Sequence, residues 1–97
     1  MSKITESARG EDCQVRIVGC CSFDPSKTIW SHARWGAAGR GKSIKAIDEC
    51  GAYACTNCDA AYDGQRQVTG VSRSEIDADW NMGHHRSLVI LKEKGLL

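Results

Sequence analysis

The sequence predicts a small α+β domain braced by a bound metal ion, and three features predict it. Short β-branched and aromatic segments precede a Cys-x-x-Cys turn, an amphipathic segment closes the chain, and six cysteines fall within 97 residues. A core of this size supplies only about 3–5 kcal/mol, so a chain of this length needs a metal or disulfide staple. We therefore expect residues 1–97 to form one zinc-braced domain.

The first half of the chain predicts strands. Residues 1–12 are polar and predict a loose arm or a short helix. Residues 13–17 alternate apolar and polar side chains as a strand does, and the Asp24-Pro25 step marks a turn. Residues 28–35 are β-branched and aromatic, which predicts a second strand or hairpin arm before a glycine-rich basic loop, residues 36–42.

The Cys-x-x-Cys turn is expected to lead into a short helix. Residues 51–54 are apolar and precede the turn, and residues 59–62 have the composition to begin a helix that Gly64 ends after about two turns. Residues 65–71 are ambiguous, with a short strand through Val68 and Val71 as one option.

The C-terminal segment predicts the helix that forms the core. Ser72-x-x-Glu75 is a capping box that opens a helix over 73–95. Its expected inner face repeats every three or four positions, at Ile76, Trp80, His84, Leu88 and Leu91. Gly83 lies inside it at a cost of about 1 kcal/mol relative to alanine, which favours a kink or a broken helix pair.

The cysteines predict a structural zinc site. Cys55 and Cys58 can place two thiolates on one tetrahedral ion, and an upstream pair would complete the ligand set. Cys13 supplies one upstream ligand and either Cys20 or Cys21 the other. A redox role is the alternative, but no βαβ pattern surrounds the motif as in a thioredoxin-like fold. The sixth cysteine, at position 50, is expected to be a buried thiol.

The N-terminus and the hydropathy of the chain predict a cytoplasmic protein. The first residues contain no apolar run of the kind that a secretory signal needs, and disulfides are rare in the cytosol. The longest apolar run, residues 88–91, is far shorter than the roughly 20 residues of a membrane span.

The charge distribution predicts contact with phosphates. The net charge is only +1, yet residues 25–47 contain no acidic side chain. The basic residues of this segment are Lys27, Arg34, Arg40, Lys42 and Lys45. Such local positive charge favours nucleic acid, although a solvated loop is the alternative.

Asp59 and Asp63 have the spacing of metal ligands. Residues four apart lie on one face of a helix, so both carboxylates can reach one ion. The alternative is that both aspartates simply favour a helix N-terminus through the helix dipole.

The order of these features resembles the HNH branch of the His-Me finger nucleases. A hairpin cysteine, His32 at the end of a β-like segment, a basic loop, a Cys-x-x-Cys and a helix with ligands at i and i+4 follow one another. The resemblance implies a zinc-braced ββα-metal unit with an added C-terminal helix. In that unit the strand histidine activates water, and the helix holds a divalent ion against the scissile phosphate.

Over most of its length the chain is also similar to small prophage-encoded proteins described as nucleases, the YbcO-like family. The similar segments are residues 8–10, 13–17, 31–34, 48, 51–55, 58–64, 86–87 and 92–96. The family's seven-residue gap after Cys13 selects Cys21 over Cys20. Asp59 stands where the family usually has histidine, and Ser31 stands where many HNH enzymes have aspartate. Aspartate suits Mg²⁺ or Mn²⁺, so Asp59 can preserve the site while changing its metal preference.

The resemblance implies a metal-dependent endonuclease that hydrolyses phosphodiester bonds of DNA, encoded by a phage or prophage and acting in the bacterial cytoplasm. His32 would be the general base, because the ordinary pKa of imidazole suits proton abstraction near neutrality. Asp59 and Asp63 would hold the catalytic Mg²⁺ or Mn²⁺. Arg34 would clamp a phosphate oxygen from the same strand face as His32. The DNA backbone contacts would come from Arg34, Arg40, Lys42 and Lys45.

The rival hypothesis is a zinc-braced nucleic-acid-binding or adaptor module without hydrolytic activity, with His32 a plain strand-edge histidine. His84 lies on the apolar stripe and is expected in the core, while a ligand or phosphate-contact role is the alternative for His84 and His85. A nuclease of this size that cuts both strands is expected to act as a two-fold homodimer.

Overall fold

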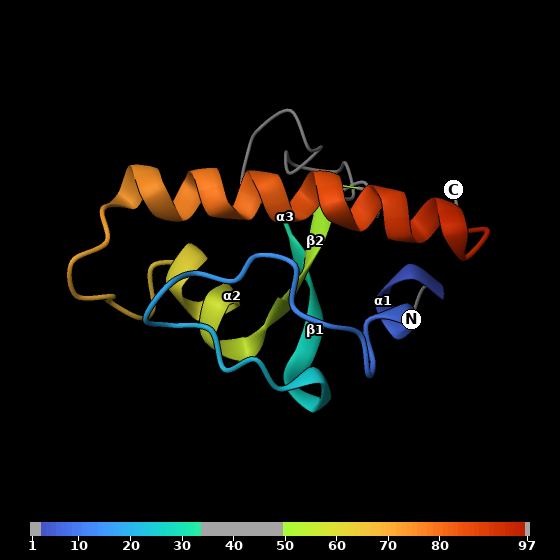
Figure 1. Ribbon diagram of the computed structural model, residues 1–97, viewed down its shortest axis with the longest axis horizontal. Coiled ribbons are helices and arrows are strands. Elements are labelled where there is room, and N and C mark those ends of the chain that lie inside the picture. The colour runs from blue at the N-terminus through green and yellow to red at the C-terminus, as the bar shows by residue number, and fades with distance from the viewer. Residues whose placement is uncertain (1–2, 34–49, 97) are drawn as a thin grey trace, which may run out of the picture.

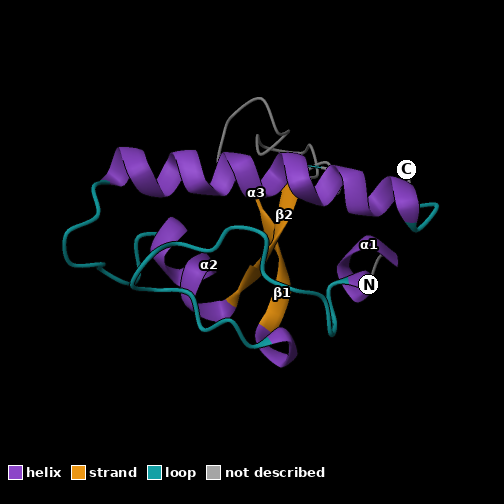
Figure 2. Cartoon of the chain, in the orientation of Figure 1, coloured by secondary structure: helices purple, strands orange, loops and turns teal. Residues whose placement is uncertain are grey.

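The protein has an α+β fold in which one long helix lies along a small two-stranded sheet (Figure 1). The computed structural model describes residues 3–33 and 50–96. The elements are α1 (Lys3–Ser7), the 3-10 turn η1 (Pro25–Lys27), β1 (Thr28–His32), β2 (Gly51–Cys55), α2 (Thr56–Tyr62) and α3 (Arg73–Glu93). α1, both strands and α2 lie on one side of α3, and long irregular segments separate α1 from η1 and α2 from α3 (Figure 2).

The two strands are antiparallel, with Thr28 opposite Cys55 and His32 opposite Gly51. All five residues of β2 are buried, because this strand packs against α3. The Tyr53 amide of β2 donates to Ser87 Oγ of α3 at 2.9 Å, which fixes the strand on the helix. β1 lies on the outer side of the pair, and His32 at its end is exposed to solvent.

The strand expected at residues 13–17 does not form. Cys13, Val15 and Ile17 are buried and Arg16 is exposed, so the apolar side chains were placed correctly. Arg16, however, has a φ of 53°, and its amide points back to Cys13 Sγ at 3.4 Å. The segment therefore turns around a sulfur atom instead of extending.

α2 is the expected short helix, and it begins three residues earlier than predicted. Cys55 Sγ accepts the Cys58 amide at 3.4 Å and so acts as the N-cap. The helix ends at Tyr62, two residues before Gly64, whose φ is 82°. No strand forms in residues 65–71.

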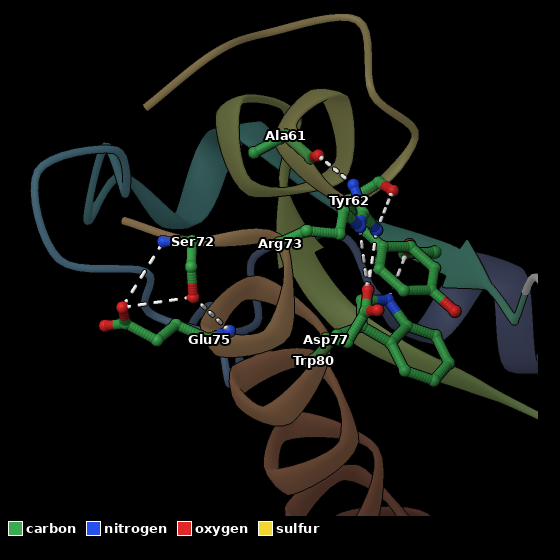
Figure 3. A network of polar contacts seen from close by, with 8 residues as sticks. Ala61, Tyr62, Ser72, Arg73, Glu75, Asp77 and Trp80 are labelled. Carbon is green, nitrogen blue, oxygen red and sulfur yellow. Dashed lines mark hydrogen bonds and ion pairs between the residues drawn. The ribbon is translucent and has the colours of Figure 1, made fainter. Parts of the chain in front are cut away.

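The guanidinium group of Arg73 caps the C-terminal end of α2 from α3 (Figure 3). It donates to the carbonyl oxygens of Ala61, at 3.0 Å, and of Tyr62. Asp77, one turn further along α3, forms an ion pair with the same guanidinium group at 2.6 Å. These contacts fix the end of α2 relative to α3.

α3 begins with the predicted capping box and runs unbroken through Gly83. Ser72 Oγ accepts the Glu75 amide at 3.2 Å, and the Glu75 carboxylate accepts the Ser72 amide at 3.3 Å (Figure 3). The expected break at Gly83 is wrong, because the glycine serves close packing. A Cβ atom there would lie 2.7 Å from Cγ2 of Val15 and 2.9 Å from its Cα.

Buried side chains form two clusters, and α3 joins them. One cluster surrounds the cysteines and contains Ile76 and Trp80, and the other contains Trp30, Tyr53 and Leu91. The predicted inner face of α3 is confirmed: Ile76, Trp80, His84 and Leu91 are buried, and Leu88 is partly buried. Among the described helices, none combines the length and apolar composition needed to cross a membrane.

Candidate metal centre and candidate active site

The structure brings together the thiols of four cysteines, Cys13, Cys21, Cys55 and Cys58. Their four sulfur atoms lie within 4.8 Å of one another. The Cys13–Cys58 sulfur distance is 3.8 Å, and the Cys21–Cys55 distance is 3.9 Å. A tetrahedral zinc ion with Zn–S bonds of about 2.3 Å has S–S edges of about 3.8 Å. The four thiols therefore fit a metal such as zinc.

Backbone amides donate hydrogen bonds to three sulfurs of the cluster. Arg16 N donates to Cys13 Sγ, Phe23 N to Cys21 Sγ, and the Ser22 and Cys58 amides both donate to Cys55 Sγ, each at 3.4 Å. Hydrogen bonds to sulfur favour the thiolate form, which is the form that binds metal.

Burial and contacts between the sulfurs shift the pKa values of these thiols. The contact with Cys58 lowers the pKa of Cys13 to about 5, and the same contact, with burial, raises the pKa of Cys58. Burial raises the pKa of Cys21 to about 12. Four thiolates this close repel one another, so a bound divalent cation would allow all four to ionise together.

Two cysteines stay outside the cluster, although all six lie in the described part of the chain and none forms a disulfide. Cys20 is buried beside the cluster, but its Sγ donates to the Asn57 carbonyl at 3.2 Å. Cys21, and not Cys20, therefore joins the other three. Cys50 is partly buried and packs against the same core, so it is more exposed than expected.

A second polar site begins one residue after the cysteine cluster, at Asp59. Trp80 Nε1 donates to Ser31 Oγ at 3.0 Å, and Ser31 Oγ donates to Asp59 Oδ1 at 2.6 Å. Trp80 and Ser31 are 0% and 1% exposed, and Asp59 is half-buried. This relay runs from α3 through β1 to α2 and fixes one oxygen of the Asp59 carboxylate.

The charges of His32 and Asp63 both act on Asp59. Burial raises the pKa of the Asp59 carboxyl, the hydrogen bond from Ser31 and the charge of His32 lower it, and the charge of Asp63 raises it. The hydrogen bond from Ser31 to Asp59 also holds the end of β1, where His32 follows Ser31, against α2. Asp63, at the C-cap of α2, is exposed.

The aspartates do not form a closed metal site of their own. In residues 3–33 and 50–96, the four cysteines form the only group of at least three metal-ligating side chains that lie close enough to share one ion.

His84 lies in the core, as expected. Its Nδ1 is 2.7 Å from the Gly51 carbonyl oxygen, and its ring stacks on Trp80 with centroids 5.8 Å apart. His85 is exposed. The predicted phosphate-contact residues Arg34, Arg40, Lys42 and Lys45 lie outside the described residues.

The sequence did not reveal the roles of Ser31 and Trp80. Ser31 lies 28 positions from Asp59 and 49 positions from Trp80, and no local pattern links these three residues. The departure of Ser31 from the usual HNH aspartate was the only signal in the sequence.

The fold and the cysteine cluster define a small α+β protein with a four-thiol site that could hold a metal. A family model described as "Putative nuclease YbcO" matches residues 2–96. The chain belongs to this YbcO family.

Individual relatives agree with this membership. The chain is 31% identical over 88 residues to "Putative nuclease YbcO" of Escherichia coli (strain K12), which covers 78% of this chain and 90% of the relative. A protein of the same description from Enterobacteria phage 82 matches to the same extent. A solved structure described as a putative bacteriophage protein from Escherichia coli str. K-12 substr. MG1655 has a TM-score of 0.75 at 28% identity. The match covers 94% of this chain and 98% of the chain in that structure.

Proposed function

We propose that the protein is a metal-dependent endonuclease of the HNH type that hydrolyses phosphodiester bonds of DNA. The observation that carries the proposal is the placement of Asp59: it follows Cys58 of the four-cysteine site directly, and its carboxylate is hydrogen-bonded to Ser31, the residue before His32 on β1. The family description as a nuclease and the phage relative support it.

The two acidic residues and the histidine have separate roles in this proposal. Asp59 and Asp63 hold a divalent ion, Mg²⁺ or Mn²⁺, and that ion would neutralise charge on the phosphate and the leaving oxygen. Asp59 Oδ1 accepts the hydrogen bond from Ser31 Oγ, and we assign Oδ2, the other carboxylate oxygen, to the ion. His32 accepts the proton of the attacking water from the open side of β1.

The four-cysteine site has a structural role in the proposal. It joins the segment of Cys13 and Cys21 to the β2–α2 turn, and Asp59 follows its last ligand directly. Zn²⁺ bound there would hold the first turn of α2, and therefore Asp59, in a fixed position beside β1.

Phosphate contacts complete the proposed substrate site. We assign them to Arg34, Arg40, Lys42 and Lys45, whose positive charges suit the DNA backbone without reading its sequence. The active form is proposed to be a homodimer, because two sites related by a two-fold axis can cut both strands of a duplex in one encounter. We place its action in the bacterial cytoplasm.

The first prediction tests His32 as the base. Wild-type protein is expected to nick plasmid DNA with Mg²⁺ or Mn²⁺, and His32→Ala should lower the rate on the order of 10²–10⁴-fold while DNA affinity is retained. Plasmid nicking and fluorescence anisotropy measure the two properties separately.

His85→Ala is the matched control, because His85 is also an exposed histidine but lies on α3. It should leave the cleavage rate unchanged. Equal losses in both variants would remove His32 from the chemistry.

A binding or adaptor module is the second candidate function. The metal-ligand geometry favours this function. Among the described residues the clustered metal ligands are all cysteines, and a site closed by four thiolates is typical of structural zinc. Wild-type protein that binds nucleic acid but cleaves none with Mg²⁺, Mn²⁺ or Zn²⁺ would establish this function instead.

A further inference from the structure

Arg16 and Phe23 share an unusual backbone conformation and border the same cavity. Their φ angles are 53° and 54°. In the part of the chain that the structure describes, no other non-glycine residue has a positive φ. The cavity has a volume of about 190 Å³ and is lined by Asp12, Cys13, Arg16 and Phe23. Strained backbone conformations concentrate at ligand-binding and other functional sites, so this cavity is a candidate binding site.

The cysteine cluster explains the conformation of both residues. The Arg16 amide donates to Cys13 Sγ and the Phe23 amide donates to Cys21 Sγ, each at 3.4 Å. Each positive φ thus belongs to a turn around a cysteine of the cluster. Metal binding would therefore fix the two side chains at the rim of the cavity.

Folding does not explain why position 23 is a phenylalanine. Glycine adopts a positive φ without the steric cost that a bulky residue pays. The Phe23 side chain is 70% exposed, so it contributes little to the core in return. An exposed aromatic ring held on a rigid turn is instead a surface on which another flat ring can stack.

The other groups of the cavity suit a nitrogenous base. Arg16 Nε donates to the Cys13 carbonyl at 2.8 Å, which holds the planar guanidinium group beside the cavity. Guanidinium planes and phenylalanine rings both stack on bases, and a carboxylate such as that of Asp12 can accept from an exocyclic amino group. The cavity has room for one flat ring but not for a duplex.

We propose that Phe23, Arg16 and Asp12 form a site that holds one unpaired nucleobase. This inference rests on nucleic acid being the partner in the proposed function, and it narrows the substrate class to DNA with an unpaired segment. A base inside a duplex is stacked on its neighbours and cannot present its face to Phe23.

The test compares binding of a single-stranded oligonucleotide and of its duplex by fluorescence anisotropy, at one fixed salt concentration. Phe23→Ala should weaken single-strand binding by about 5- to 150-fold, the loss expected for one stacked base, and change duplex binding less than about 2-fold. Phe23→Trp should restore single-strand affinity. Metal content, measured by elemental analysis, should be the same in all variants.

Val18→Ala is the matched control, because Val18 is 79% exposed on the same segment but does not line the cavity. It should leave both affinities unchanged. Equal losses on both substrates, or no loss, would overturn the site. Self-association that Phe23→Ala abolishes would assign the ring to a protein contact and would also overturn it.

The outcomes separate this inference from the nuclease proposal. If Phe23→Ala selectively weakens single-strand binding and the wild type cleaves no nucleic acid, the base site is supported and the nuclease proposal is wrong. If the wild type cleaves DNA and Phe23→Ala leaves single-strand binding unchanged, the nuclease proposal is supported and the base site is wrong.

Discussion

At the scale of one residue, the ionised carboxylate of Asp59 lowers the stability of the folded protein, because it is partly buried. Its carboxylate is half-buried, and burial is the main cause of its raised pKa. The hydrogen bond from Ser31 offsets part of that cost, and the charge of Asp63 adds to it. Such a conflict between stability and local charge is common at functional sites.

The pH dependence of this cost gives a prediction. Because the folded-state pKa of Asp59 lies above the ordinary 3.8, the folded protein loses stability relative to the unfolded chain as pH rises through that raised pKa. Asp59→Asn cannot ionise, and its side-chain oxygen can still accept from Ser31. The variant should therefore have a higher Tm than the wild type at about pH 7, and a smaller advantage at about pH 4.5.

Asp63→Asn is the control for this experiment, since Asp63 lies on the same face of α2 but is exposed. It should change Tm less than Asp59→Asn does. A lower Tm for Asp59→Asn at neutral pH would show that the carboxylate stabilises the fold, contrary to this account.

Gly83 gives a prediction at the scale of secondary-structure elements. Alanine would improve helix propensity by about 1 kcal/mol, but its Cβ would lie 2.7 Å from Val15 Cγ2 and 3.0 Å from the Gln14 carbonyl oxygen. Overpacking of this kind costs about 1–3 kcal/mol, so Gly83→Ala should be net destabilising. Thermal or denaturant unfolding of the metal-loaded protein measures the change.

Ala78→Gly provides the comparison, because Ala78 is exposed on the same helix and reports propensity alone. It should lower the free energy of unfolding by about 1 kcal/mol. If Gly83→Ala were instead stabilising by a similar amount, the close approach of the Val15 segment to α3 would be wrong.

Local signals in the sequence predicted α3 better than the strands. The Ser72–Glu75 capping box and the apolar repeat depend on neighbouring residues, and both are confirmed. At residues 13–17 the alternation predicted which side chains are buried, but hydrogen bonds to a cysteine sulfur determine the backbone. Gly83 was misjudged for the same reason, because its role depends on Val15, a residue distant in the chain.

The candidate site was predictable only where its residues share a motif. The spacing of the cysteines and of the two aspartates indicated which residues can meet, and the cysteine cluster is present. The relay from Trp80 through Ser31 to Asp59 requires α3, β1 and α2 to meet, and no local pattern encodes that meeting. The roles of His32, Asp59 and Asp63 stay predictions.

At the scale of the whole molecule, the four-cysteine site joins the Cys13–Cys21 segment to the β2–α2 turn. Zinc binding in small metal-folded peptides contributes about 10–16 kcal/mol, well above the roughly 3–5 kcal/mol from a core of this size. Purified protein is therefore expected to carry about one zinc ion per chain. A strong chelator should abolish its cooperative thermal transition, and added Zn²⁺ should restore it.

The neighbouring cysteines Cys20 and Cys21 make the matched pair for the last prediction. Cys21→Ser removes one sulfur of the cluster, so it should lose zinc to a chelator of moderate affinity and lower Tm sharply. Cys20→Ser leaves the four sulfurs intact and should keep the ion, with the smaller loss in Tm expected for a buried thiol that bonds to the Asn57 carbonyl. Elemental analysis and circular dichroism measure both effects. Retention of zinc by Cys21→Ser together with its loss from Cys20→Ser would reverse the ligand assignment, and with it the geometry that holds Phe23 at the proposed base site.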